Sequence, residues 1–292
     1  MSYDSYTSDS SSTLLGRFDF RHLLTLTLVL VAATILLGVA ARATGSGLAC
    51  EANWPQCDAG PYNLLPANLP SFYEWIHRFV AMFAGFAIVG TAAAAALASS
   101  VDRRVTGLVV VGTILTPIQV ILGRETVLQY ELEILSLHFW TAVLIFVLFV
   151  VATVIVWRSR LRARHVTIAL GTGAVMVPLH VAFSPLFITD ITTYSPSIQT
   201  AQYGITLALL AAVTTATMVG WRRFDQRLLT GLFLALPALA MLVLFLGRRA
   251  VMTLSPVLDL VYVATAGALF AAFVAGIWLV RERVEPNGSA SA

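Results

Sequence analysis

Long apolar runs alternate with short polar or charged connections along the whole chain. A helix needs about 20 predominantly apolar residues to cross a bilayer. Eight runs have about this length, at 22–41, 73–97, 105–122, 134–157, 166–188, 198–221, 228–247 and 256–280. They lack the alternating pattern of β-barrel strands. The pattern therefore predicts an all-α polytopic membrane protein with eight transmembrane helices.

Composition supports this fold class and excludes others. Of the 292 residues, 58% are hydrophobic and 11% are charged, and the mean hydropathy is +0.84. Soluble domains carry roughly 25% charged residues. These values exclude a soluble enzyme, a disordered chain and a nucleic-acid binder, so we expect a lipid bilayer around the protein.

The arginines predict the orientation, because basic residues concentrate in cytoplasmic loops. The chain has no Lys, and 13 of its 18 arginines fall on one side of the predicted helices. This distribution predicts a multi-pass protein of the plasma membrane with both termini in the cytoplasm. The first span follows a Ser-rich tail without a convincing cleavage site, and we interpret it as a retained helix.

A short repeat relates the two halves of the chain. Residues 122–128 (LGRETVL) recur as residues 246–252 (LGRRAVM), and each half contains four spans. We therefore expect two pseudo-symmetric four-helix bundles. The expected divisions are a polar tail at 1–21, an N-terminal bundle at 22–157, an Arg-rich cytoplasmic linker at 158–165, a C-terminal bundle at 166–280 and a tail at 281–292.

Two histidines in the N-terminal half are candidate haem ligands. His77 and His138 lie at matched depth below the outer ends of the second and fourth spans. Imidazoles on facing helices of one bundle can bind a haem iron from opposite sides. The alternative is that both are hydrogen-bonded between helices.

Charged residues near His77 extend this candidate site. Glu74 precedes His77 by one helical turn and is a candidate proton acceptor, or else an interfacial carboxylate that orients His77. Arg78 and Arg124 are candidate partners for haem propionates, or else interfacial arginines.

The C-terminal half does not repeat the histidine pair. The positions that correspond to His77 and His138 are Gln202 and Tyr262. His180 lies at a similar depth, and it is either a substitute ligand or a hydrogen-bonded core histidine. We therefore expect a degenerate second site.

Both cysteines, Cys50 and Cys57, fall in the longest predicted outer loop, at about 42–72. Disulfides persist outside the cytoplasm, so the pair is either a structural staple or a redox-active pair.

Three motifs resemble the haem A synthase family. They are TGSGLAC at 44–50, WPQC at 54–57 and EWIHR at 74–78, with Leu122-Gly123 and His138 at suitable separations. The resemblance covers most of the N-terminal half. In the C-terminal half it is limited to helix layout and the repeated Leu-Gly segment.

The resemblance implies an eight-helix membrane oxidoreductase that converts the C8 methyl of haem O to a formyl group through successive hydroxylations. By this resemblance His77 and His138 would flank the substrate haem, and Glu74 would take part in catalysis. Cys50 and Cys57 would assist haem delivery or electron transfer. Haem O synthase would act upstream, and the product haem A would serve terminal oxidase assembly.

The family usually binds a haem b cofactor through a second His pair in the C-terminal bundle. Because Gln202 and Tyr262 stand at those positions, we expect that haem b is lost or held only weakly through His180. Electrons would then leave through a quinone, the cysteine pair or a redox partner. The alternative functions are a non-catalytic haem-binding assembly factor or carrier, a membrane thiol oxidoreductase and a solute transporter.

Overall fold

The computed structural model describes residues 19–49, 65–128, 131–253 and 255–284, and this part of the chain contains helices and no strand. The helices are α1 (Phe20–Ala43), the short η2 (Ser46–Leu48), α2 (Leu69–Leu97), α3 (Arg103–Leu128), α4 (Leu132–Trp157), α5 (Ala163–Ala182), α6 (Pro185–Ile188), α7 (Pro196–Arg223), α8 (Arg227–Thr253) and α9 (Pro256–Val284). Eight of them are long and apolar enough to span a membrane. The prediction of an all-α protein with eight transmembrane helices is confirmed.

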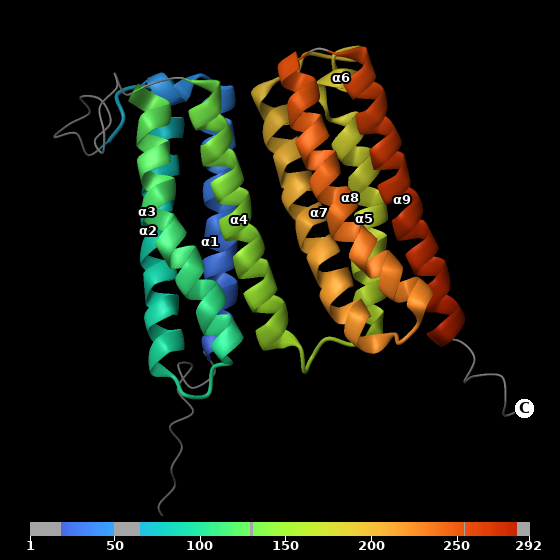
Figure 1. Ribbon diagram of the computed structural model, residues 1–292. Coiled ribbons are helices and arrows are strands. Elements are labelled where there is room, and N and C mark those ends of the chain that lie inside the picture. The colour runs from blue at the N-terminus through green and yellow to red at the C-terminus, as the bar shows by residue number, and fades with distance from the viewer. Residues whose placement is uncertain (1–18, 50–64, 129–130, 254, 285–292) are drawn as a thin grey trace, which may run out of the picture.

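The long helices form two groups of four that lie side by side (Figure 1). In the first group, α1 and α3 each pack against both α2 and α4. In the second group, α5 and α8 each pack against both α7 and α9. Taken in chain order, the long helices of the two halves therefore have the same neighbours, as the short sequence repeat predicts.

The fifth predicted span, 166–188, is wrong at its C-terminal end. The structure ends α5 at Ala182 and starts the separate α6 at Pro185. Pro185 has no backbone N–H and disfavours helical geometry at Ser184, whose backbone is extended there. The Arg-rich linker is also shorter than expected, because α5 begins at Ala163 and leaves residues 158–162 as the connection.

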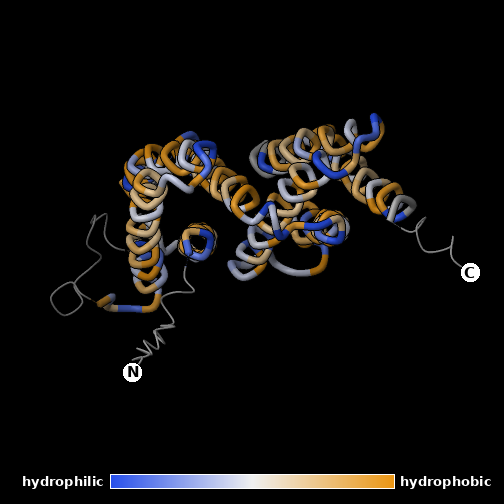
Figure 2. Tube along the Cα trace, turned by 90° about the horizontal axis from the view of Figure 1, so that it is seen from below, coloured by the Kyte–Doolittle hydropathy of each residue, from blue (hydrophilic) through white to orange (hydrophobic). Residues whose placement is uncertain are grey.

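Apolar residues make up most of each long helix, as the hydropathy colouring along the chain trace shows (Figure 2). Large side chains such as Phe86, Val257 and Trp278 are more than half exposed. A membrane protein exposes such residues to lipid, whereas a soluble protein would bury them.

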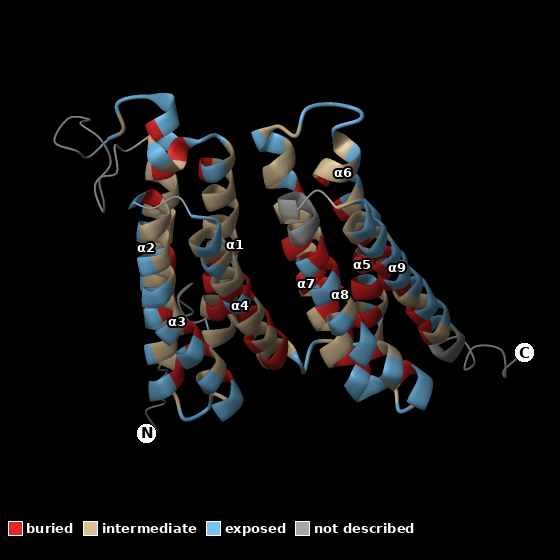
Figure 3. Cartoon of the chain, turned by 45° about the horizontal axis from the view of Figure 1, so that its top comes forward, coloured by how far each residue is buried: buried red, intermediate tan, exposed pale blue. Residues whose placement is uncertain are grey.

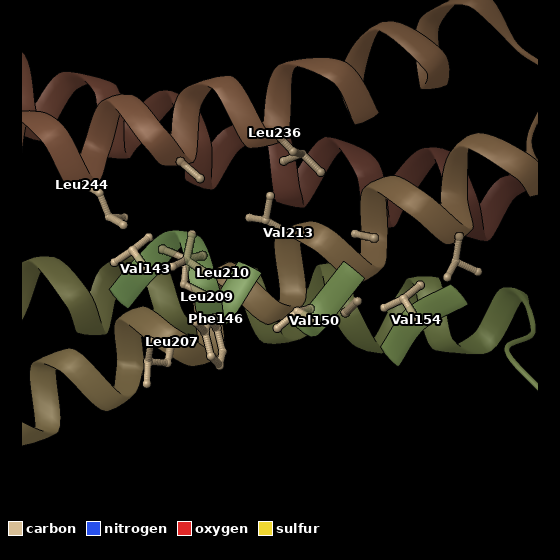
Figure 4. Packing of buried hydrophobic residues seen from close by; sticks show 14 of the residues in the cluster. Val143, Phe146, Val150, Val154, Leu207, Leu209, Leu210, Val213, Leu236 and Leu244 are labelled. Atoms are coloured by element: carbon tan, nitrogen blue, oxygen red, sulfur yellow. The ribbon is translucent and has the colours of Figure 1, made fainter. Parts of the chain in front are cut away.

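Buried residues concentrate on α4 and α7, where the two groups of helices meet (Figure 3). Val143, Phe146 and Val150 of α4 point toward Leu210 and other residues of α7 (Figure 4). These side chains are at most 4% exposed. The α4–α7 contact therefore holds the two halves together, and α7 also packs on α1.

Buried polar contacts join helices of the first group. The hydroxyls of Thr27 in α1 and Thr91 in α2 are 2.8 Å apart, and both residues are fully buried. The Trp157 indole of α4 donates to the Thr25 hydroxyl at 3.0 Å. Such bonds contribute about 0.6 kcal/mol each on average within membranes, so they set helix register more than stability.

Candidate functional site

His77 lies eight residues inside the start of α2 and points toward α1. Its Nδ1 donates to the Thr34 carbonyl oxygen at 3.1 Å. Gly38, one turn further along α1, gives the ring its space, because a Cβ at that position would lie 2.8 Å from His77 Cε1. A carbonyl partner on one ring nitrogen fixes the tautomer and leaves Nε2 as the metal-binding atom.

His138 lies six residues inside the start of α4 and points toward α3. The Gln119 side-chain amide lies 3.3 Å from His138 Nε2. Gly123 leaves room for the ring, because a Cβ there would lie 3.1 Å from His138 Cε1. Within the described part of the chain, His138 Nδ1 and Gln119 Oε1 are buried without a hydrogen-bond partner.

All four helices of the first group contribute to this site. At a rise of 1.5 Å per residue, His77 and His138 lie about 9–12 Å from the starts of their helices. The structure therefore places both sequence-predicted histidines in one four-helix group, each supported by one glycine and one hydrogen-bonding residue of the neighbouring helix.

Glu74 and Arg78 form an ion pair one turn from His77. Arg78 Nε donates to Glu74 Oε1 at 2.9 Å, and Glu74 is only 6% exposed. The predicted proton acceptor is thus buried and oriented by a cation on its own helix.

The other predicted residues of the N-terminal half lie away from the histidines or outside the described residues. Arg124 is exposed and pairs with the neighbouring Glu125 at 2.7 Å. Cys50 and Cys57 fall in the range 50–64, outside the described residues.

At the corresponding end of the second group, Gln202 is the centre of a hydrogen-bond network. Its Oε1 accepts from the Tyr194 hydroxyl at 2.5 Å, and its Nε2 donates to the His180 carbonyl oxygen at 3.2 Å. The Thr206 hydroxyl donates to the Gln202 carbonyl oxygen and therefore accepts from His180 Nδ1 at 2.9 Å. His180 is thus a hydrogen-bonded buried histidine, and Nε2 is its acceptor nitrogen.

Tyr262 occupies the position of His138 in the second group. It is 1% exposed, and its ring centroid lies 6.3 Å from that of His180. A Cβ on Gly247 would lie 3.0 Å from Tyr262 Cε2. Gly247 and Tyr262 therefore repeat the Gly123 and His138 contact with the same spacing along the chain, with a Tyr in place of the candidate ligand His138.

A cavity of about 130 Å³ opens beside this network. Polar side chains from both halves line it, including Arg42, His180, Tyr194, Gln202, Arg248 and Tyr262. Arg248 donates to the Ser136 hydroxyl at 2.8 Å and lies over the Phe139 ring of α4. Ligand pockets usually enclose about 300–1,000 Å³, so this cavity suits a small polar molecule or water.

Sequence reasoning missed several residues of these sites. Thr206 follows Gln202 by one helical turn, and Arg248 repeats Arg124 in the duplicated segment, so both carried a usable signal. Tyr194 lies in a connection between helices and carried none.

Among the described residues, no group of three or more His, Cys, Asp or Glu side chains gathers to hold a metal ion. Two histidines on opposite sides of a porphyrin need no third protein ligand, since the macrocycle supplies the other four donors.

Comparison with known proteins gives partial matches. A protoheme IX farnesyltransferase of Haloarcula marismortui is 32% identical over 133 residues, which is 46% of this chain and 28% of that protein. A haem A synthase of Bacillus licheniformis is 26% identical over 135 residues, which is 46% of this chain and 44% of that protein. A protoheme IX farnesyltransferase of Halobacterium salinarum is 34% identical over 95 residues, or 32% of this chain and 21% of that protein.

The matched segments thus span less than half of the length of these relatives. No family model and no solved structure matches the chain. The match to a curated haem A synthase agrees with the motifs around Glu74 and His77. By motifs and by sequence comparison, the chain resembles the haem A synthase family.

Proposed function

We propose that this membrane protein, which is related to proteins of haem A biosynthesis, is a haem A synthase that oxidises the C8 methyl of haem O to a formyl group. The observation that carries the proposal is that His77 and His138 lie at similar depth on α2 and α4 of one four-helix group. Both are positioned by the same combination of a glycine and a polar partner.

The residues present fit a haem substrate. His77 donates its Nδ1 proton to Thr34 and so presents Nε2, whereas His138 Nε2 accepts from the Gln119 amide, so its lone pair would bind iron in exchange for that hydrogen bond. Gly38 and Gly123 let the two rings pack against the backbone of the neighbouring helices, where a Cβ would be too close. Haem bound here supplies the iron chemistry, and the two histidines bind and orient it.

Glu74 is the group that handles protons in this proposal. Conversion of a methyl to a formyl group takes its oxygen from water and releases equal numbers of protons and electrons. A buried carboxylate can accept protons, while the electron acceptor takes the electrons. Arg78 holds the carboxylate at 2.9 Å, so its geometry is fixed before the substrate arrives. Arg78 also carries positive charge that suits a haem propionate.

The second group of helices does not fit a bis-histidine haem. Both ends of the Gln202 amide are occupied by hydrogen bonds, and a Tyr stands where the second ligand would be. We therefore propose no electron transfer through a haem b in the second group of helices. The electron acceptor is a quinone, the cysteine pair or a protein partner. His180 has Nε2 as its acceptor nitrogen and is the candidate for any weak axial ligand.

The cellular setting follows from the same proposal. Haem O synthase supplies the substrate, and terminal oxidase assembly takes the product. The arginine distribution supports cytoplasmic termini, and we propose the plasma membrane as the location.

Co-expression with a haem O synthase in a host that lacks haem A tests the reaction. We expect haem A, or its hydroxylated precursor, in extracts resolved by chromatography and mass spectrometry. Glu74→Gln keeps an oxygen for Arg78 but removes the proton acceptor, so haem A should fall about 10²–10⁴-fold while haem binding persists.

The main alternative is a haem-binding assembly factor or carrier, which needs His77 and His138 but not Glu74. If the protein is folded and loaded with haem but the extracts contain only haem O or haem b, the result would favour the carrier function over the enzymatic one. We do not propose farnesyl transfer for this protein, because the matches cover less than a third of the length of the farnesyltransferases.

A further inference from the structure

A second cavity, separate from the haem site, lies between the two groups of helices. It encloses about 370 Å³ between the C-terminal ends of α4 and α7 and the connection that follows α4. Figure 1 places the α4–α5 connection at the end of the molecule opposite α6. Three arginines and several apolar residues line this basic cavity, among them Arg158, Arg222, Arg223, Val154, Ile155 and Met218.

The arginines give the cavity an excess of positive charge. Arg158 lies 3.5 Å from the Asp102 carboxylate, and its side chain is 57% exposed. Arg223 donates to the Leu161 carbonyl oxygen at 2.6 Å, which fixes its position without neutralising it. Arg222 is exposed, and no ion pair joins it to an acidic side chain in the described part of the chain. Among the described residues, one ion pair, with Asp102, thus involves one of the three guanidinium groups.

The walls are apolar where they run toward the membrane interior. Val154, Ile155 and Val219 are nearly buried and belong to the same helices as the arginines. A free inorganic anion would gain nothing from these walls, whereas a lipid has a charged headgroup and apolar chains. Guanidinium groups bind phosphate oxygens in pairs of hydrogen bonds, and basic pockets between transmembrane helices hold anionic headgroups.

We propose that the basic cavity binds the phosphate group of an anionic phospholipid, whose acyl chains follow the apolar walls formed by α4 and α7. The volume lies within the range of about 300–1,000 Å³ that is usual for ligand pockets. Because α4 belongs to the first group and α7 to the second, the bound lipid links the two halves. The inference does not depend on the reaction proposed for the histidine site.

Native mass spectrometry of the detergent-solubilised full chain tests this inference. Phosphatidylglycerol and phosphatidylcholine with the same acyl chains are titrated separately. We expect preferential retention of phosphatidylglycerol, with about a fivefold loss of affinity in Arg222→Gln and about 20-fold in Arg158→Gln combined with Arg222→Gln.

Arg104→Gln is the matched control, because Arg104 is exposed near the start of α3 and does not line the cavity. Circular dichroism and haem binding show that each variant is folded. Equal retention of both lipids, or an equal loss in Arg104→Gln, would overturn the proposal in favour of general surface charge. Full displacement of phosphatidylglycerol by millimolar glycerol phosphate would overturn the proposal of a lipid ligand and identify a free phosphate ester as the ligand.

Discussion

At the scale of single residues, the second polar site is built from groups that satisfy one another. Tyr194, Gln202, Thr206 and His180 form a chain of hydrogen bonds in which the donor and acceptor roles are fixed. A buried amide with both ends bonded is costly to disturb, since each lost partner leaves a desolvated polar group. Gln202 is therefore a structural centre and not a vacant ligand position.

Tyr194 offers a test of this network by pH. It lies in the connection before α7, where burial raises the pKa of its phenol to about 12, with smaller effects from Tyr203 and Arg42. Because the folded pKa lies above the ordinary value near 10, the contribution of Tyr194 to stability is complete below pH 10 and is lost between pH 10 and 12.

Tyrosinate absorbance measures this directly. Spectra of the native protein and Tyr194→Phe, recorded in detergent, should nearly coincide at pH 10 and differ by about half a tyrosinate at pH 12. A difference of about half a tyrosinate already present at pH 10 would show that Tyr194 has an ordinary pKa and is not buried as described.

At the scale of helices, the apolar runs predicted all eight spans, while their ends and contacts were harder to infer. The break at Ser184 and Pro185 was missed because the run stays apolar through it, although Pro185 marks it in the sequence. His77 and His138 could be predicted because ionisable groups within spans are rare. Their partners Thr34 and Gln119 could not, since hydrogen bonds between helices depend on packing and register.

Glycines on the facing helices position the histidines, and this can be tested within α3. Gly123→Ala places a Cβ 3.1 Å from His138 Cε1, so we expect an overpacking cost of about 1–3 kcal/mol and roughly tenfold weaker haem binding. Gly107 is the matched control on the same helix, because a Cβ there meets nothing within 4 Å.

Haem titration followed by visible absorbance, together with thermal unfolding, compares the two variants. Gly107→Ala should bind haem normally and unfold at the same or a slightly higher temperature, as alanine favours helix by about 0.5–1 kcal/mol. Equal haem affinity in both variants would argue that Gly123 has no part in placing His138.

At the scale of the whole molecule, the two halves share one helix arrangement and differ in the chemistry at corresponding positions. The Gly123–His138 contact returns as Gly247–Tyr262, whereas His77 is replaced by Gln202. Close helix packing needs a small residue on one helix and a ring on the other that fills the space beside it. A Tyr ring fills this space as well as a His ring does. Iron binding by imidazole depends on the ring nitrogens, so the second half shares the packing but lacks the two candidate ligands.

This difference predicts the haem stoichiometry of the purified protein. We expect one bis-histidine haem per chain, and none in the double variant His77→Ala and His138→Ala, measured by pyridine haemochrome assay against protein concentration. Gln202→His combined with Tyr262→His restores both imidazoles beside the retained Gly247, so it should raise the ratio toward two. His180→Ala tests whether His180 is an axial ligand. The ratio of haem to protein stays unchanged if His180 binds no haem, and it falls if His180 holds a second haem. A ratio of two in the unmodified protein that falls in His180→Ala would mean that the second group still binds haem through a different ligand set.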